Sequence, residues 1–202
     1  MLNAKAMGWS LTAGFVTLIL LFAAGMLGGD HDGTAEEVAY LATNNDWMWI
    51  VPITMVGGLT MIIFTAGWIS WIRNIDDSSA VLTYARYLPL LALSLSWVGI
   101  LSGGVGSRTA ADNADAAFAL MRLSDFTGFI GIVMMLLSFF LAGTAAYFKK
   151  SGTPALMGLL GILGLAGVVM SFIPGMGFLV FMAIFPLSLL LLAFIGIQQA
   201  RA

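Results

Sequence analysis

The 202-residue chain contains no cysteine, one histidine and little charge, with 8 Lys and Arg and 10 Asp and Glu. Without thiolates it has no iron–sulfur cluster, no thiolate zinc site and no thiol nucleophile. One histidine excludes bis-histidine haem and histidine-rich metal centres. Eight basic residues are too few to match the phosphates of a nucleic acid. Charged residues make up 9% of the chain, against about a quarter in soluble domains, which excludes an ordinary soluble enzyme.

Apolar residues, by contrast, make up 60% of the chain. Six apolar runs are long enough, or nearly so, to cross about 30 Å of hydrocarbon as helices. The runs cover residues 8–27, 47–72, 88–105, 126–148, 154–173 and 176–197. The first run follows Lys5 and ends in small residues, as a signal peptide does, but it is longer than a signal core. The sequence therefore predicts an all-α polytopic membrane bundle, a single six-helix transmembrane domain over residues 1–202.

Basic residues divide unevenly between alternate connections of this predicted bundle. The two termini and the connections after the second and fourth runs hold Lys5, Arg73, Arg86, Lys149, Lys150 and Arg201. The other connections hold only Arg108 and Arg122. Because cytoplasmic loops are enriched in Lys and Arg, both termini are predicted to lie in the cytoplasm.

The first outer connection contains helix signals. Thr34 and Glu37 have the spacing of a capping box, in which a hydroxyl caps the helix and a carboxylate reaches back. Val38 and Leu41 then form a short apolar face. We expect a short helix at the membrane surface, followed by Asp46 as the cap of the second span.

The second outer connection follows the same plan. Thr109 and Asp112 have related spacing, and Ser124 or Asp125 is placed to cap the fourth span. The residues between them form an apolar face: Ala116, Ala117, Leu120 and Met121. This pattern predicts a second short surface helix. The likeness of the two connections reflects either a duplication or the same capping chemistry used twice.

Six spans divide into three and three, and an odd-numbered half gives an inverted repeat, as in many transporters. Pro52 precedes Met55 by three residues as Pro154 precedes Met157, although a small alphabet also produces such matches by chance. The fifth run carries small residues that let helix backbones approach closely, at Gly158, Gly161, Gly164 and Gly167. These glycines favour a helix-packing face, and the alternative is a flexible gate.

The spans hold almost no charge, whereas proton relays and ion paths use ionisable residues within the membrane. This argues against an ion-coupled pump, and the lack of a lysine within a span excludes a rhodopsin. Trp97 is unusual because it lies deep in the third run, beside Ser94 and Ser96. These three residues either contact a hydrophobe, such as a lipid, quinone or carotenoid-like molecule, or fill space between helices.

Two polar clusters belong to the outer connections. The outer-mouth cluster either rims a cavity or caps helices and solvates the surface, and it comprises Asp46, Arg108, Asp112, Asp115, Arg122 and Asp125. The other cluster comprises Asp30, His31 and Asp32, with Glu36 or Glu37 nearby. Its Asp-x-Asp-Gly run resembles part of a calcium loop, but the rest of that pattern is absent, so we expect no metal.

The layout also resembles a known family. Six spans, a surface helix before the second, a basic turn from Arg73 to Arg86, and Pro154 followed by Gly158 and Gly161 are similar to an uncharacterised bacterial family of six-helix integral membrane proteins, a domain of unknown function. The likeness covers the chain from about Thr34 onward. It implies a protein of the bacterial inner membrane and implies no activity. That family carries an acid or polar group near its last span, where this chain has Ser188 and then Gln198.

Three functions stay open. The first is a non-catalytic membrane protein, either an accessory subunit of a larger assembly or a binder of a lipophilic molecule. The second is a small transporter or channel with a 3+3 inverted repeat, and the third is an intramembrane enzyme acting on a lipid-like substrate. The sequence shows no nucleophile motif or phosphate loop, so we expect no catalytic residue and no cofactor. The expected partners are membrane lipids and other membrane subunits or a second copy of the chain, with no nucleic acid.

Overall fold

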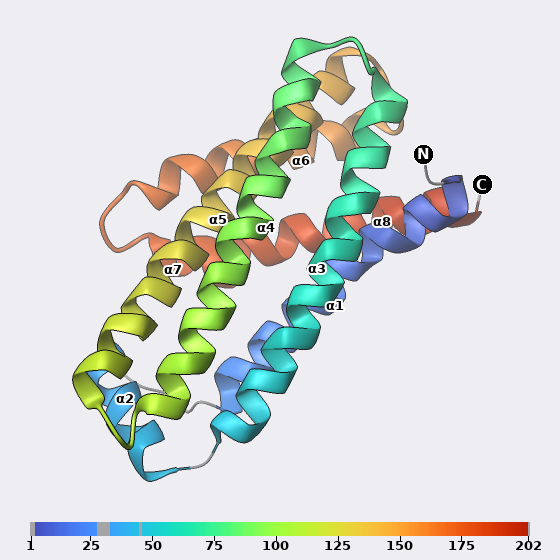
Figure 1. Cartoon of the computed structure of the whole chain (residues 1–202). Helices are drawn as coiled ribbons and strands as arrows, with labels where there is room; N and C mark the ends of the chain where they lie inside the picture. Colours follow the sequence, from blue (N-terminus) through green and yellow to red (C-terminus); the bar gives the residue numbers. More distant parts are fainter. Residues whose placement is uncertain (1–2, 28–32, 45, 202) are drawn as a thin grey trace.

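The computed structural model describes residues 3–27, 33–44 and 46–201, and within these ranges the chain is helical with short turns and no strand (Figure 1). Six helical segments are long and apolar enough to cross a membrane. They are α1 (Ala4–Leu27), α3 (Trp47–Ile75), α4 (Ala80–Thr109), α5 (Ala114–Phe148), α6 (Pro154–Ser171) and a last span composed of α7 (Gly177–Leu179), the π turn η1 (Val180–Ile184) and α8 (Phe185–Arg201). The shorter α2 covers Thr34–Thr43. The predicted all-α bundle is confirmed, and the chain is a multi-pass membrane protein.

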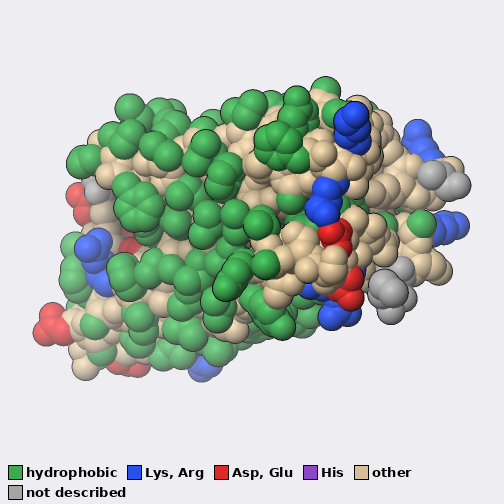
Figure 2. All heavy atoms as spheres, turned by 90° about the horizontal axis from the view of Figure 1, so that it is seen from above, with side chains coloured by type: hydrophobic (Ala, Val, Ile, Leu, Met, Phe, Trp, Pro, Cys, Tyr) green, Lys and Arg blue, Asp and Glu red, His purple; other side chains and the backbone are tan. Residues whose placement is uncertain are grey.

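The spans pack in chain order and close into a ring. Each packs against the next, from α1 through α3, α4, α5 and α6 to α8, and α8 returns to pack against α1. Both termini lie at one end of the ring with the α3–α4 and α5–α6 turns, and this end is termed the terminal end; α2 lies at the opposite end (Figure 1). Hydrophobic side chains cover the middle of the molecule and charged ones gather toward the two ends (Figure 2). This banding matches a bundle surrounded by hydrocarbon.

Glycines set the close approach of α1 to its two neighbours. A Cβ built on Gly8 would lie 2.4 Å from the carbonyl oxygen of Gly196 on α8. One built on Gly67 of α3 would lie 2.5 Å from the Cβ of Ser10 on α1. Neither seam has room for a side chain, so backbone contact takes the place of interdigitated side chains there.

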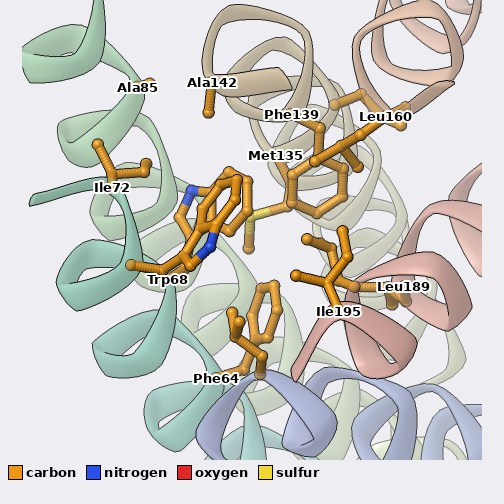
Figure 3. Close-up of a cluster of buried hydrophobic side chains, with 14 of the residues drawn as sticks. Phe64, Trp68, Ile72, Ala85, Met135, Phe139, Ala142, Leu160, Leu189 and Ile195 are labelled. Atoms are coloured by element: carbon orange, nitrogen blue, oxygen red, sulfur yellow. The ribbon is translucent and has the colours of Figure 1, made fainter. Parts of the chain in front are cut away.

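An aromatic cluster fills the middle of the ring. Phe64 and Trp68 of α3 point toward Phe139 of α5 (Figure 3). The rings of Trp68 and Phe139 meet edge to face with centroids 5.2 Å apart, and Phe185 of α8 stacks on Phe139 at 6.4 Å. Trp68 and Phe139 are both fully buried. Each such aromatic pair contributes about 0.5–1.5 kcal/mol of stability in addition to the hydrophobic effect of the area it buries. The middle of the ring is therefore a packed core.

A buried serine joins three spans beside this cluster. Trp68 Nε1–H donates to Ser138 Oγ at 2.8 Å, and the Ser138 hydroxyl donates to the carbonyl of Ala85 on α4 at 2.6 Å. The usual helical donor to that carbonyl is the N–H of residue 89, but residue 89 is Pro89, which has none. Ser138 therefore satisfies an indole N–H and a carbonyl freed by proline at the same time.

Both capping predictions for the first outer connection are wrong. Gly33 is the N-cap of α2, and the hydroxyl of Thr34 instead donates to Asp125 Oδ2 on α5 at 3.2 Å. Asp46 is at the N-cap position of α3 but makes no capping bond, because its carboxylate accepts the hydroxyl of Tyr40. In each case the side chain that was expected to bond to a backbone N–H of its own helix bonds to a side chain of another helix.

The second predicted surface helix is not a separate element. α5 begins at Ala114, where the Oδ1 of Asn113 accepts from the Ala116 N–H at 3.0 Å, and it continues through Ser124 and Asp125. No glycine or proline interrupts residues 114–126, so the helix starts well before its apolar stretch. Its 35 residues give a length of about 50 Å, which exceeds the hydrocarbon thickness. The predicted span 126–148 therefore covers only the apolar part of α5, and the helix begins before it.

The last span contains a π turn immediately before a proline. Pro186 has no N–H for the carbonyl of Met182, and the N–H of Phe185 donates to the carbonyl of Val180, five residues earlier. The predicted span 176–197 is therefore continuous but locally wider than an α-helix.

Replacing Ser138 with Ala should lower the free energy of unfolding by about 2–4 kcal/mol, because Trp68 Nε1 and the Ala85 carbonyl each lose their partner at about 1–3 kcal/mol. Thermal unfolding of the purified protein in detergent measures this. Ser94→Ala is the matched control, since Ser94 is exposed and bonds only to the Leu90 carbonyl of its own helix. Its effect should stay within about 0.5 kcal/mol.

The same experiment separates the two partners of Ser138. Adding Pro89→Ala to Ser138→Ala supplies a new N–H to the Ala85 carbonyl and should recover part of the lost stability. If the double variant is no more stable than Ser138→Ala alone, the freed carbonyl is not what Ser138 satisfies.

Candidate functional site

The structure does not gather the outer-mouth cluster into a site. Three of its members contact helix ends: Asp46 accepts from Tyr40, Asp125 accepts from Thr34, and Arg108 lies 5.3 Å from the centre of the Trp47 ring. The other three, Asp112, Asp115 and Arg122, are exposed. Across the described ranges none of the six forms an ion pair. The first three members therefore connect α2, α3, α4 and α5 at this end.

One member of this cluster changes the acidity of its neighbour. The hydrogen bond from Tyr40 to the carboxylate of Asp46 raises the pKa of Tyr40 above its ordinary value, and partial burial and the negative charge act in the same direction. Because Tyr40 on α2 donates to Asp46 at the start of α3, this hydrogen bond is a structural contact between the two elements.

Trp97, Ser94 and Ser96 point to different neighbours. The Trp97 ring covers Gly58 of α3, where a Cβ would lie 3.0 Å from the indole. Ser96 faces Gly131 of α5, and Ser94 is exposed. Both serine hydroxyls bond to carbonyls of their own helix. The three residues are close together on α4, but their side chains point to different surroundings and do not line one cavity.

The candidate metal cluster falls largely outside the described residues. Asp30, His31 and Asp32 are not described, so the structure does not place them. Among the residues that are described, no group of three His, Cys, Asp or Glu side chains is arranged to hold a metal ion.

The fifth-span glycines lie against α5. A Cβ on Gly164 would lie 2.4 Å from the backbone nitrogen of Phe140, and one on Gly161 would lie 2.9 Å from the hydroxyl oxygen of Thr144. Gly167 faces Leu136 and Ile184, and Gly158 lies beside the ring of Tyr147. All four positions therefore contribute to one close seam between α5 and α6.

A cavity of about 260 Å³ lies at the terminal end, and neither the outer-mouth cluster nor Trp97 and its neighbouring serines line it. Three separate segments form it: the end of α3, the α5–α6 turn with the start of α6, and the end of α8. Its lining consists of Trp71, Asn74, Ile75, Ser151, Gly152, Thr153, Met157, Ile195, Gln198 and Gln199. This set combines an apolar part with amide and hydroxyl side chains and includes no ionisable group.

The apolar part of the lining is continuous with the packed core. Trp71 is buried, and its ring stacks on Trp68 with centroids 4.9 Å apart. Trp68 is the residue that Ser138 holds. The position of the cavity wall therefore depends on the buried hydrogen-bond chain.

The polar part of the lining has spare hydrogen-bonding capacity. Gln199 Oε1 is buried with no partner in the described structure. The hydroxyl of Thr153, at the N-cap of α6, makes no capping bond. Asn74 Nδ2 donates only to Met7 Sδ, at 3.2 Å, and sulfur is a weak acceptor. Such groups are suited to bind a polar ligand by hydrogen bonds.

Ion pairs brace the turns around this cavity. Lys149 pairs with Asp76, and Arg86 pairs with Asp77, whose carboxylate also lies 4.0 Å from Arg73. Hydrogen bonds hold the pKa of Asp76 well below its usual range. The bond from Lys149 contributes most, and two bonds from Ser78 contribute less. Because the folded-state pKa is depressed, these contacts stabilise the fold at neutral pH and weaken only as the pH falls below about 4.

A second hollow of about 300 Å³ lies between the start of α4 and the end of α5. It is lined by Ser79, Val81, Phe140, Leu141, Thr144, Ala145, Phe148 and Lys149. Most of these side chains are apolar, so the hollow offers few hydrogen-bonding groups.

Sequence reasoning missed the terminal cavity. Its polar residues are neutral, and motif searches weigh titratable side chains. One signal was available: adjacent amides, Gln198 and Gln199, end the last span, where the apolar run had stopped.

Comparisons of the chain with protein-family models, with curated proteins and with solved structures found no match.

The α5–α6 seam predicts opposite outcomes for the same substitution at two positions of α5. A Cβ on Gly143 would lie 2.5 Å from the backbone nitrogen of Gly161, whereas Gly128 has open space within 4 Å. Gly143→Ala should therefore destabilise the protein by about 1–3 kcal/mol. Gly128→Ala should stabilise it by up to about 1 kcal/mol through helix propensity. Unfolding by SDS titration measures both, and equal effects would contradict a tight seam.

Proposed function

We propose that this protein is a non-catalytic, multi-pass membrane protein that binds the polar end of an amphiphilic molecule in the terminal cavity. The observation that carries the proposal is the lining: amide and hydroxyl groups next to Trp71, Ile75, Met157 and Ile195. A concave site with a few convergent polar groups and apolar walls is the usual form of a small-molecule site. Its place at the end of the apolar band suits a molecule with one polar end and one apolar end.

The lining favours binding over catalysis. Hydrolysis needs an activated nucleophile or a general base, and proton transfer needs a group that titrates near neutral pH. Asn, Gln, Ser and Thr side chains supply hydrogen bonds at this cavity without such a group. An intramembrane enzyme is therefore the weaker reading.

The packed middle of the ring disfavours a transporter. Phe64, Trp68 and Phe139 fill the level at which a carrier would hold its substrate. Most of the described polar side chains there are engaged: Thr17 bonds to Thr60 across α1 and α3, and Ser138 has two partners. The buried Thr65 hydroxyl is the exception.

The orientation and the host membrane belong to the proposal. The distribution of basic residues supports a cytoplasmic position for the terminal end, and the resemblance stated for the sequence supports a bacterial inner membrane. The amphiphile would then be bound at the cytoplasmic leaflet. Assembly with other membrane subunits stays a prediction from the sequence.

Because the chain has no cysteine, single cysteines report its orientation directly. Ser78→Cys in the α3–α4 turn and Ala111→Cys in the α4–α5 turn are both at exposed positions. In intact spheroplasts a membrane-impermeant maleimide should label Ala111→Cys, and it should reach Ser78→Cys only after permeabilisation. The reverse pattern would contradict cytoplasmic termini.

Filling the cavity should remove its ligand. Ser151→Phe places a large side chain in the lining, and Ser94→Phe adds the same bulk at an exposed position elsewhere on the spans. Native mass spectrometry of protein extracted with membrane lipid should show a retained amphiphile on the wild type and on Ser94→Phe. Retention should fall about tenfold or more on Ser151→Phe, as expected when a ligand's binding groups are blocked. Equal retention on all three proteins would overturn the proposal.

A further inference from the structure

The chemistry of the terminal cavity narrows the class of ligand, given the amphiphile-binding function proposed above. All five of its polar side chains, Asn74, Ser151, Thr153, Gln198 and Gln199, carry an N–H or O–H donor. No carboxylate is among the lining residues to repel an anion. Each of the five also carries an acceptor oxygen, and Gln199 Oε1 is buried without a partner in the described structure. A ligand that offers acceptor oxygens together with a hydroxyl donor, as a glycerophosphate headgroup does, would match this set.

The charge around the cavity is strongly positive. Six basic and two acidic side chains belong to the terminal end, which gives it a net charge of +4. At the other end the described residues include two basic side chains, Arg108 and Arg122, and six acidic ones, a net charge of −4. An anion is therefore drawn to the end of the protein that holds the cavity.

Basic residues also flank each segment of the lining. Arg73 precedes Asn74, Lys150 precedes Ser151, and Arg201 follows Gln199 by two positions. In the described structure Lys149 and Arg86 have close acidic partners, whereas Lys150 and Arg201 form no ion pair. The basic side chains without an acidic partner are thus among those next to the cavity.

The apolar lining identifies the source of the anion. Trp71 and Met157 are buried walls, and Ile75 and Ile195 lie near the ends of membrane spans. A free ion would gain nothing from these walls, whereas a lipid would place its first apolar groups against them. From the donors, the charge and these walls, we infer that the cavity binds the phosphate-bearing headgroup of a membrane phospholipid.

Lipids that differ only in the headgroup test this inference. Delipidated full-length protein in detergent is titrated with phosphatidylglycerol, or with diacylglycerol of the same acyl chains, and binding is read by native mass spectrometry. Phosphatidylglycerol should bind about tenfold more tightly, because charge-assisted hydrogen bonds to phosphate add to the apolar contact. Inorganic phosphate at millimolar concentration should compete weakly.

Two sets of variants locate the effect. The double variant Lys150→Gln with Arg201→Gln should lose most of the preference for phosphatidylglycerol, and Arg108→Gln at the opposite end should keep it.

Equal binding of both lipids, with loss of both on Ser151→Phe, would overturn the phosphate inference and leave the amphiphile site intact. Binding of both lipids that Ser151→Phe leaves unchanged would overturn the site and the inference together. Competition by inorganic phosphate as strong as that by phosphatidylglycerol would overturn the lipid as the source.

Discussion

Inside a bilayer a polar group has no water to bind, so an indole N–H or a carbonyl freed by proline must find its partner within the protein. Ser138 meets this requirement for Trp68 and for the Ala85 carbonyl, and so joins α3, α4 and α5 at one point. The aromatic cluster packs around that point, and Trp71 stacks on Trp68 to form a wall of the terminal cavity. The buried hydrogen-bond chain thus supports both the packed middle of the ring and a wall of the terminal cavity.

The sequence was sufficient for the class of fold because hydropathy over some twenty residues is a strong signal for a spanning helix. It was insufficient for helix ends, since a helix continues past the hydrocarbon wherever nothing breaks it, as α5 does from Ala114 to Asp125. Local capping rules failed at Thr34 and Asp46 because both side chains bond to distant elements. Ser138 was visible in the sequence as a polar residue within a span, but its role depends on Trp68 and Pro89, and no local pattern links these positions.

The candidate site was harder to predict from the sequence than the fold was. Trp97 and the outer-mouth cluster were chosen because single residues looked unusual, and the structure sends their side chains to different neighbours. The terminal cavity is made by neutral residues from three segments that meet only when the ring closes. Its charge environment was visible in advance, since the uneven distribution of Lys and Arg that predicts orientation also places a positive field at the cavity. What the sequence lacked was the geometry that combines the two.

In the proposed function the ligand binds only in the terminal cavity, while the middle of the ring is closed by its own side chains. The most direct measurement is an electron cryo-microscopy structure of the protein in nanodiscs formed from its native membrane lipids. The account predicts headgroup density between the α5–α6 turn and the end of α8, with unbroken side-chain density around Trp68, Ser138 and Phe139. Ordered ligand density in the middle of the ring, with an empty terminal cavity, would contradict it.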